Sequence, residues 1–294
     1  MRIPKKNRVW IISTARKITH EEIQPSIKLL ESWNLEVCTG ETIGAEYHQF
    51  AGNDNLRVKD FQKALNDPRT RAIWCARGGY GTVRIIDAIN FSEYSKNPIP
   101  IIGYSDVTVL HSHLHNLGFE SIHATMPINI EENSEASVQS LKDILDGKDL
   151  IYKISSSEIN RGGNAKGKLV GGNLSILYSL MGSESAINTD GKILFIEDLD
   201  EYLYHIDRML ISLKRNGYFE NLKGLIVGSF TKIHDNTIPF GKTAEEIIRD
   251  VVEEYDFPVI FNFPAGHIDD NRALIMGREV MINVNASQAV IGFV

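Results

Sequence analysis

Apolar residues recur along the first part of the chain in short runs that alternate with segments of helical spacing. The strand-like runs are residues 9–12, 35–38, 72–76 and 99–102. The segments that repeat apolar side chains every three or four positions are residues 21–33, 58–65 and 82–89. Strands that alternate with helices of this length predict a parallel, helix-covered sheet with functional groups at the carboxyl ends of its strands.

The pattern changes between residues 129 and 164, which are polar and rich in turn-forming residues. Beyond them, strand-like runs become more frequent and lie at residues 192–196, 224–228, 259–261, 279–283 and 289–293. We therefore divide the chain into an N-terminal α/β domain over residues 1–130, a connection over 131–164, and a C-terminal β-rich α+β domain over 165–294.

Composition is that of an ordinary soluble globular protein, with 294 residues, 43% hydrophobic and 23% charged. The net charge of −7 gives no general attraction to nucleic acid or to an anionic membrane. No apolar stretch reaches membrane-spanning length, and residues 9–12 are too short for a signal-peptide core, so we expect a cytoplasmic protein. The two cysteines, Cys38 and Cys75, cannot form a disulfide framework, and the run around Cys75 is typical of a buried thiol.

A sharp turn is expected at Ser105, because an apolar run ends at Gly103 and a helical pattern through Val107, Leu110 and Leu114 follows. The serine hydroxyl would then stand at the carboxyl edge of the sheet. The N–H groups and positive dipole end of the helix suit a nucleophile whose attack generates an oxyanion. Only the first glycine of the G-x-S-x-G nucleophile turn is present, and serine is also a preferred helix cap, so this stretch alone leaves a plain cap open.

A glycine-rich turn, Arg-Gly-Gly-Tyr-Gly, occupies residues 77–81 after a strand-like run. Glycines let the backbone approach a ligand closely and direct N–H groups at a phosphate or an oxyanion. The third glycine of the dinucleotide fingerprint is missing, and residues 241–243, Gly-Lys-Thr, lack the first glycine of a phosphate-binding loop. Without further context, a tight connection that binds nothing explains residues 77–81 equally well.

Three of the nine histidines, His111, His113 and His115, alternate within one helical segment. Only His111 and His115 could share an ion, and no glutamate completes a metalloprotease motif, so we interpret them as a partly exposed helix surface. We expect no metal and no cofactor. His267 follows a strand-like run in a loop, where catalytic bases are commonly held, although a structural histidine explains it equally well.

Two acids, Glu197 and Asp198, end a strand-like run. A carboxylate at this position could orient a histidine and stabilise its imidazolium form. Strand alternation sends the two side chains to opposite faces, and spacing alone does not say which one faces a site. Both could instead be solvated or pair with Arg208.

Together these motifs resemble the serine LD-carboxypeptidase family. That family includes the muramoyl-tetrapeptide carboxypeptidases of bacterial cell-wall recycling and the microcin C immunity peptidases. Each match is weak alone, but their order and spacing are specific and extend over nearly the whole chain. The matching segments are residues 76–81, 103–108, 171–174, 193–198, 206–210 and 266–267.

The resemblance implies that Ser105 is the nucleophile, His267 the general base and Glu197 the acid that orients the base. It also implies that the backbone N–H groups of Gly79 and Asp106 form the oxyanion hole. The expected fold is a Rossmann-like parallel-sheet domain that carries the nucleophile turn, joined to a smaller β-rich α+β domain, with the site between them. A homodimer is implied as well.

The implied activity is that of a metal-independent hydrolase, a serine carboxypeptidase that releases a C-terminal D-amino acid from an L–D bond, as in the murein tetrapeptide. Its partner would be a small peptide, with no nucleic acid and no membrane. Two alternatives remain: cleavage of a peptidyl-nucleotide such as microcin C by the same triad, and a nucleotide-binding or non-catalytic α/β protein. The sequence departs from the family pattern at residues 13–16, 123–126 and 269–272, which bear on the substrate pocket.

Overall fold

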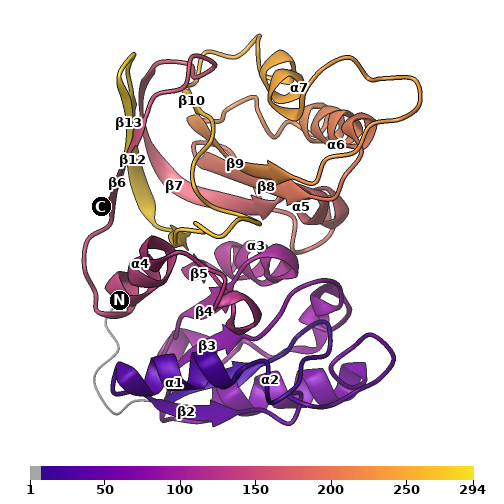
Figure 1. Cartoon of the computed structure of the whole chain (residues 1–294), viewed down its shortest axis with the longest axis vertical. Helices are drawn as coiled ribbons and strands as arrows, with labels where there is room; N and C mark the ends of the chain where they lie inside the picture. The colour runs from indigo at the N-terminus through magenta and orange to yellow at the C-terminus, as the bar shows by residue number, and fades with distance from the viewer. Residues whose placement is uncertain (1–7) are drawn as a thin grey trace.

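The computed structural model describes residues 8–294, which form two β-sheets (Figure 1). The six-stranded sheet has the order β11-β5-β4-β3-β1-β2, and the seven-stranded sheet the order β10-β9-β8-β7-β12-β13-β6. The strands are β1 (Arg8–Ile12), β2 (Glu36–Thr39), β3 (Thr70–Cys75), β4 (Ile101–Gly103), β5 (Ser121–His123), β6 (Ile151–Ser155), β7 (Gly163–Asn173), β8 (Ile193–Leu199), β9 (Gly224–Thr231), β10 (Val259–Ile260), β11 (Leu274–Met276), β12 (Glu279–Val284) and β13 (Gln288–Phe293). The α-helices in the described part are α1 (Gln24–Ser32), α2 (Asp54–Asn66), α3 (Thr108–Asn116), α4 (Glu135–Leu145), α5 (Leu174–Leu180), α6 (Leu203–Arg215) and α7 (Ala244–Val251). The predicted α/β architecture is confirmed.

The first sheet is parallel from β2 to β5 and covered on both faces. In β1, Val9 and Ile11 join the core cluster that includes residues of α1 and α4, whereas Trp10 and Ile12 join the cluster that includes residues of α2 and α3. A strand buried on both faces needs apolar side chains at every position, which explains the unbroken apolar runs of the sequence.

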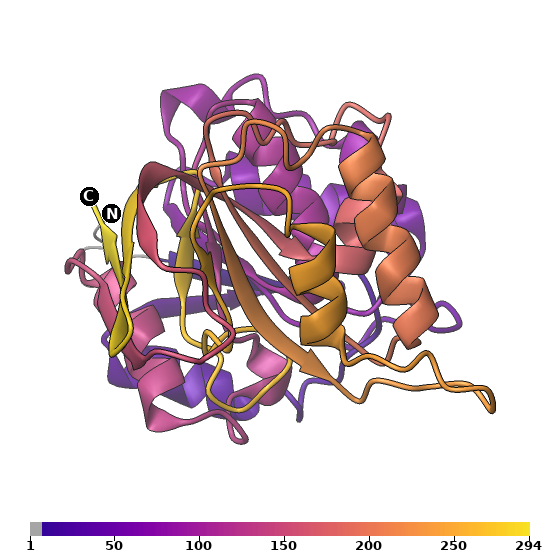
Figure 2. The same ribbon diagram turned by 90° about the horizontal axis from the view of Figure 1, so that it is seen from above.

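The second sheet changes character along β7. This strand pairs antiparallel with β12 through its first half and parallel with β8 through its second half. Viewed from above, α6 and α7 lie next to each other over the same sheet, and their residues share one core cluster (Figure 2). Strand β11, from the C-terminal part of the chain, pairs antiparallel with β5 and so extends the first sheet.

Two local expectations differ from the structure. Residues 82–89 form two short 3₁₀ turns, Thr82–Arg84 and Ile86–Ala88, instead of an α-helix. This stretch is rich in β-branched residues, which have low helix propensity. The segment 131–164 contains α4 and β6; α4 begins with the Ser134 side chain accepting a hydrogen bond from the N–H of Ser137. Its buried residues are spaced among polar ones, which conceals the helix in the sequence.

Burial determines the properties of two other side chains, Cys75 and His111. The thiol of Cys75 is fully buried, and burial raises its pKa to about 12, so it is not a reactive thiolate. His111, expected on a partly exposed surface, is instead buried on α3, where its ring bonds Ser121 Oγ (2.7 Å) and the carbonyl oxygen of Gly103 (2.9 Å). Within residues 8–294 no helix has the length and apolar character needed to cross a membrane.

Candidate active site

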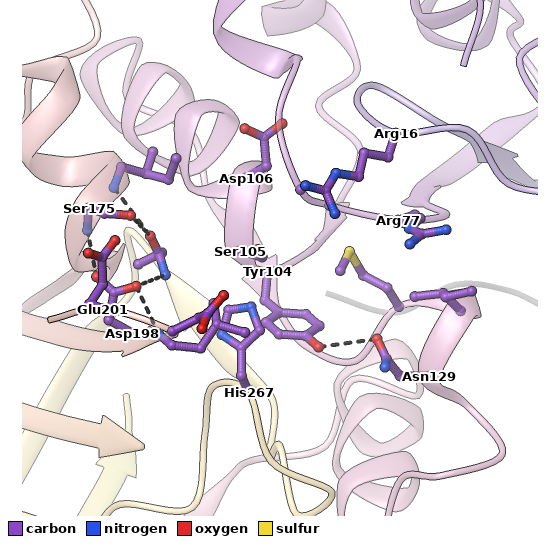
Figure 3. Close-up of a pocket in the computed structure, with 18 residues that line it drawn as sticks. Arg16, Arg77, Tyr104, Ser105, Asp106, Asn129, Ser175, Asp198, Glu201 and His267 are labelled. Atoms are coloured by element: carbon purple, nitrogen blue, oxygen red, sulfur yellow. Dashed lines mark hydrogen bonds between the residues drawn. The ribbon is translucent and has the colours of Figure 1, made fainter. Parts of the chain in front are cut away.

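A cavity of about 530 Å³ is lined by residues from both halves of the chain. Gly79 and Ser105 contribute from the loops that follow β3 and β4 of the first sheet. Asn173, Asp198 and His267 contribute from the end of β7, the end of β8 and the loop before β11 (Figure 3). The cavity thus collects residues that are up to 251 positions apart in the sequence, from Arg16 to His267.

Ser105 occupies a strained backbone conformation. Its φ is +62°, in the left-handed region that costs a non-glycine residue on the order of 1 kcal/mol. The residue begins the 3₁₀ turn Ser105–Val107, which leads directly into α3. A Cβ atom on Gly78 would lie 3.1 Å from Ser105 Oγ, closer than most Cβ contacts, so any larger residue there would crowd the hydroxyl. Strain of this kind is typical of nucleophile turns.

The two proposed oxyanion donors lie on these adjacent turns. The buried side chain of Asp106 accepts a hydrogen bond from the N–H of Thr82 (2.8 Å), which ties the serine turn to the glycine turn. The backbone nitrogen of Asp106 lies 3.4 Å from where a Cβ of Gly78 would be. Neither the N–H of Asp106 nor that of Gly79 donates a hydrogen bond to another described residue. Both groups are therefore available to a ligand oxygen in the cavity.

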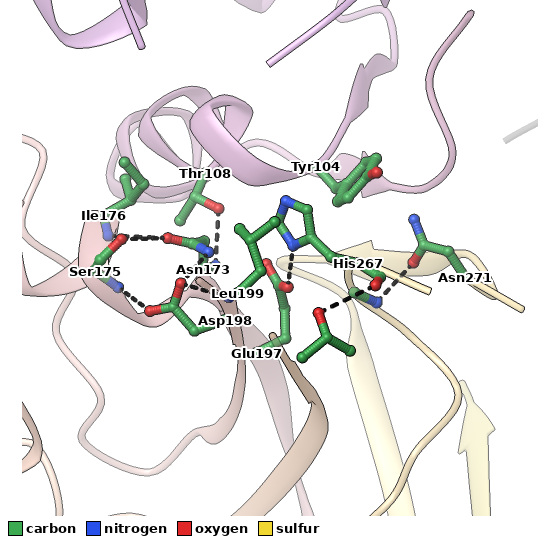
Figure 4. Close-up of polar contacts among 12 residues, drawn as sticks. Tyr104, Thr108, Asn173, Ser175, Ile176, Glu197, Asp198, Leu199, His267 and Asn271 are labelled. Atoms are coloured by element: carbon green, nitrogen blue, oxygen red, sulfur yellow. Dashed lines mark hydrogen bonds and ion pairs between the residues drawn. The ribbon is translucent and has the colours of Figure 1, made fainter. Parts of the chain in front are cut away.

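His267 and Glu197 form a buried pair on the opposite side of the cavity. His267 Nδ1 lies 2.7 Å from Glu197 Oε2, and the side chains are 13% and 0% exposed. The other ring nitrogen faces the helix that carries Thr108 (Figure 4). Gly266, with φ +114°, is required here, because a Cβ would lie 2.7 Å from Glu197 Oε2. Although Ser105 and His267 line the same cavity, no hydrogen bond joins them in the described chain, and such contacts often tighten only when substrate binds.

Glu197 controls the protonation of His267. Burial alone would lower the pKa of the imidazole, but the negative charge of Glu197 and the hydrogen bond to it outweigh burial and raise this pKa above 6.5. A histidine with a carboxylate on Nδ1 and a cavity at Nε2 is oriented to take a proton from a group in the cavity.

Asp198 belongs to a separate network that the sequence pattern does not indicate. Its buried carboxylate accepts hydrogen bonds from Asn173 Nδ2, the N–H of Ser175 and the N–H of Leu199, each at 2.9 Å (Figure 4). Burial, and then the charge of Glu197, raise its pKa to about 7. The strand register shifts between Ile196 and Asp198, and neither acid pairs with Arg208 in the described chain. The Gly-Gly-Asn motif at residues 171–173 is the sequence signal that could have indicated this network.

Two further contacts set the shape of the cavity. The ring of Tyr104 packs on the His267 ring with centroids 4.8 Å apart, and its hydroxyl donates to Asn129 Oδ1 (3.1 Å). The N–H of Asn173 donates to Thr108 Oγ1 (3.0 Å), which fastens the end of β7 to the start of α3. Within residues 8–294 no group of three or more His, Cys, Asp or Glu side chains is placed to hold an ion together, and this includes the histidines of α3.

A hydroxyl on a strained turn, two N–H groups beside it, and a histidine held by a carboxylate across a cavity are the groups that a nucleophilic hydrolase requires. Comparison with known families agrees with this class. Residues 9–124 match the profile of the LD-carboxypeptidase N-terminal domain, and residues 166–282 match that of the LD-carboxypeptidase C-terminal domain. The chain belongs to the LD-carboxypeptidase family and is a peptidase.

Curated relatives match over nearly their full length. A protein of Bacillus subtilis (strain 168) named probable murein peptide carboxypeptidase is 33% identical, with 98% of this chain and 92% of that protein covered. The murein tetrapeptide carboxypeptidase of Pseudomonas aeruginosa is 27% identical, with 96% and 95% covered.

Solved structures show the same fold. The muramoyltetrapeptide carboxypeptidase of Oxalobacter formigenes superposes with a TM-score of 0.89 at 24% identity, over 97% of this chain and 98% of that one. The microcin C7 self-immunity protein MccF superposes with a TM-score of 0.88 at 20% identity, over 99% and 97%. At these identities the superpositions establish the fold and leave the substrate undecided.

Proposed function

We propose that this protein is a serine-type LD-carboxypeptidase that removes a C-terminal D-amino acid from a murein tetrapeptide. The observation that carries the proposal is the His267–Glu197 pair, which shares a cavity with the strained Ser105 and the two unpaired N–H groups. The relative at 33% identity, named a probable murein peptide carboxypeptidase, supports the substrate class.

In the proposed mechanism, His267 takes the proton of Ser105 Oγ as that oxygen attacks the carbonyl carbon of the last peptide bond. The N–H groups of Gly79 and Asp106 hold the resulting oxyanion. Glu197 stabilises the imidazolium, which then protonates the leaving nitrogen, and the D-amino acid departs. Water, activated by His267, attacks the acyl-enzyme ester and restores the free serine.

Stereochemistry provides the test. Compared with a D-residue in the same pocket, a C-terminal L-residue has the positions of its side chain and its carboxylate exchanged. Either the carboxylate then loses its partner, or the carbonyl turns away from the oxyanion hole. We expect release of D-Ala to exceed release of L-Ala from otherwise identical tetrapeptides by roughly a thousandfold or more. Equal rates for the two epimers, or cleavage of internal L–L bonds, would contradict the LD assignment and leave a serine peptidase.

Peptidyl-nucleotide cleavage is the second candidate, and the fold shared with MccF is the observation that favours it. The same enzyme preparation would be given an aspartyl sulfamoyl adenosine conjugate beside the murein tetrapeptide. A higher kcat/KM on the conjugate would make it the primary substrate. Labelling with a fluorophosphonate, with the adduct mapped to Ser105 by mass spectrometry, separates both peptidase proposals from a non-catalytic binding role.

We also propose that the protein is a cytoplasmic homodimer, as its family resemblance implies. Apolar side chains on the outer face of the second sheet offer a surface that a second copy could cover. Ile151 on β6 and Met281 on β12 line one depression there and are 63% and 51% exposed. Light scattering on the purified protein, beside the Met281→Glu variant, would show a dimer that the substitution weakens; a wild-type monomer would refute this proposal.

A further inference from the structure

Arg16 is an exposed residue that lines the cavity beside the glycine turn. Its N–H donates to the carbonyl oxygen of Gly78 (3.4 Å), and its own carbonyl oxygen accepts from Ser13 Oγ (2.7 Å). Its side chain crosses the face of Gly79, where a Cβ would lie 2.5 Å from Arg16 Cδ and 2.7 Å from Arg16 Nε. Gly79 has φ +105°, a backbone conformation that favours glycine, and any larger residue there would also displace the Arg16 side chain.

The Arg16 guanidinium is a cation without a protein partner. Within residues 8–294 it makes no ion pair and donates no hydrogen bond, yet it lines the cavity (Figure 3). Its neighbour Arg77 lines the same wall but donates to the carbonyl oxygen of Lys17 (3.2 Å). Acids that line the cavity already have partners: Asp200 pairs with His234, and Asp198 has the three donors described above.

Distance ties this cation to the proposed chemistry. Arg16 Nε lies within about 4.2 Å of Gly79 Cα, because the Cα–Cβ bond adds about 1.5 Å to the 2.7 Å measured from the Cβ position. In a peptide, the terminal carboxylate carbon is three bonds from the carbon of the last peptide carbonyl. A carbonyl oxygen held by the N–H of Gly79 therefore leaves the terminal carboxylate within reach of the Arg16 guanidinium.

We propose that Arg16 binds the C-terminal carboxylate of the substrate and thereby restricts the enzyme to the last residue of the peptide. The assignment rests on the proposed carboxypeptidase function. A planar guanidinium matches a carboxylate with two parallel hydrogen bonds, which a lysine ammonium cannot reproduce. Arg16 lies within residues 13–16, where the sequence departs from the turn that is usual in the family. The proposed role of Arg16 therefore depends on a residue that the usual family turn does not supply.

The experiment compares two tetrapeptides that differ only in the C-terminus, one ending in D-alanine and the other in D-alaninamide. The wild type should prefer the free acid by about 100-fold in kcat/KM. Arg16→Gln should lower kcat/KM on the acid by roughly 10- to 100-fold, mainly through KM, and leave the amide rate within a factor of about three. Arg16→Lys should retain part of the preference, because it keeps a point charge.

Two controls keep the result decisive. Arg249→Gln removes an exposed arginine of α7 that lies outside the cavity, and it should behave as the wild type. Labelling of Ser105 by a small neutral fluorophosphonate at the wild-type rate would show that the Arg16→Gln site is intact, and an unchanged melting temperature would show that it is folded.

Three outcomes would overturn the assignment. The first is a wild type that cleaves acid and amide equally, and the second is an intact Arg16→Gln variant that keeps the full preference for the acid. The third is loss of that preference in Arg77→Gln alone. A wild type that labels at Ser105 but cleaves neither peptide refutes the proposed function, and the role of Arg16 with it.

Discussion

The two walls of the cavity hold their polar groups by different physical means. On the wall from the first sheet, backbone conformation does the positioning: Ser105 and Gly79 both have positive φ, and the guanidinium of Arg16 has no protein partner. On the wall from the second sheet, buried side-chain hydrogen bonds do it, around Glu197 and Asp198. The first wall is thus distinguished by the strained backbone of Ser105, and the second by the two adjacent buried acids, Glu197 and Asp198.

This difference implies different sensitivities to mutation and to pH. A change on the strained wall should alter the reaction or relieve strain with little effect on ionisation. A change on the acidic wall should shift pKa values and stability, because each buried carboxylate depends on its donors.

The largest effects should come from removing the groups that act together across the cavity. Ser105→Ala and His267→Ala should each lower kcat by about three or more orders of magnitude, and the double variant should be little worse than either single one. Steady-state kinetics on the tetrapeptide measures all three. Additive losses would show that the two walls do not cooperate in one step, and near-normal activity in either single variant would refute the triad.

Substitution of the two acids of the second wall should have clearly different effects on kcat and on stability. Glu197→Gln keeps the shape but removes the charge that stabilises the imidazolium, so kcat should fall by about a thousandfold. Asp198→Asn should lower kcat by less than tenfold. It should lower the unfolding free energy by about 1–3 kcal/mol, because the new amide N–H group would lie against hydrogen-bond donors that the carboxylate accepted from. Kinetics and urea unfolding of both variants provide the comparison. The reverse ranking of kcat would exchange the roles of the two acids.

The pH dependence of kcat/KM should report the ionisation of His267 and the influence of Glu197 on it. His267 must be neutral to accept a proton, and its pKa is raised above 6.5 by Glu197 despite burial, so kcat/KM should increase with pH through a midpoint above 6.5. In Glu197→Gln the charge and the hydrogen bond that most raise this pKa are lost, and the lowering by burial should exceed the remaining effect of Asp198. The residual activity should then have its midpoint below 6.5. An unchanged midpoint in the variant would show that Glu197 does not raise the pKa of His267.

The smallest effect should come from relieving strain on the first wall. Glycine tolerates φ +62°, so Ser105→Gly should be more stable than Ser105→Ala by about 1 kcal/mol in chemical unfolding. The matched control is Ser212 within α6, where glycine should instead be less stable than alanine by about 1 kcal/mol. The same sign at both positions would remove the argument for strain at Ser105.

The sequence by itself determined the class of fold and the positions of most candidate site residues. Some structural requirements are local and can be recognised directly in the sequence. Examples are the apolar runs of strands that are buried on both faces and the glycines of close turns. The sequence thus indicated the alternation of strands and helices and the turns at Gly79 and Ser105. It did not indicate α4, because a capped helix with a narrow apolar stripe resembles a polar linker when its packing partners are unknown.

Only the tertiary structure decided which groups meet. Glu197 and Asp198 are adjacent in the chain, and no spacing rule distinguishes them; the fold places His267 2.7 Å from Glu197 and surrounds Asp198 with donors from the end of β7 and the start of α5. The sequence marked Arg16 only as part of a departure from the family pattern at residues 13–16, and its contact with Gly79, 63 positions away, is set by the fold. Charge interactions depend on distance and burial, and both are set by packing between segments that are remote in sequence.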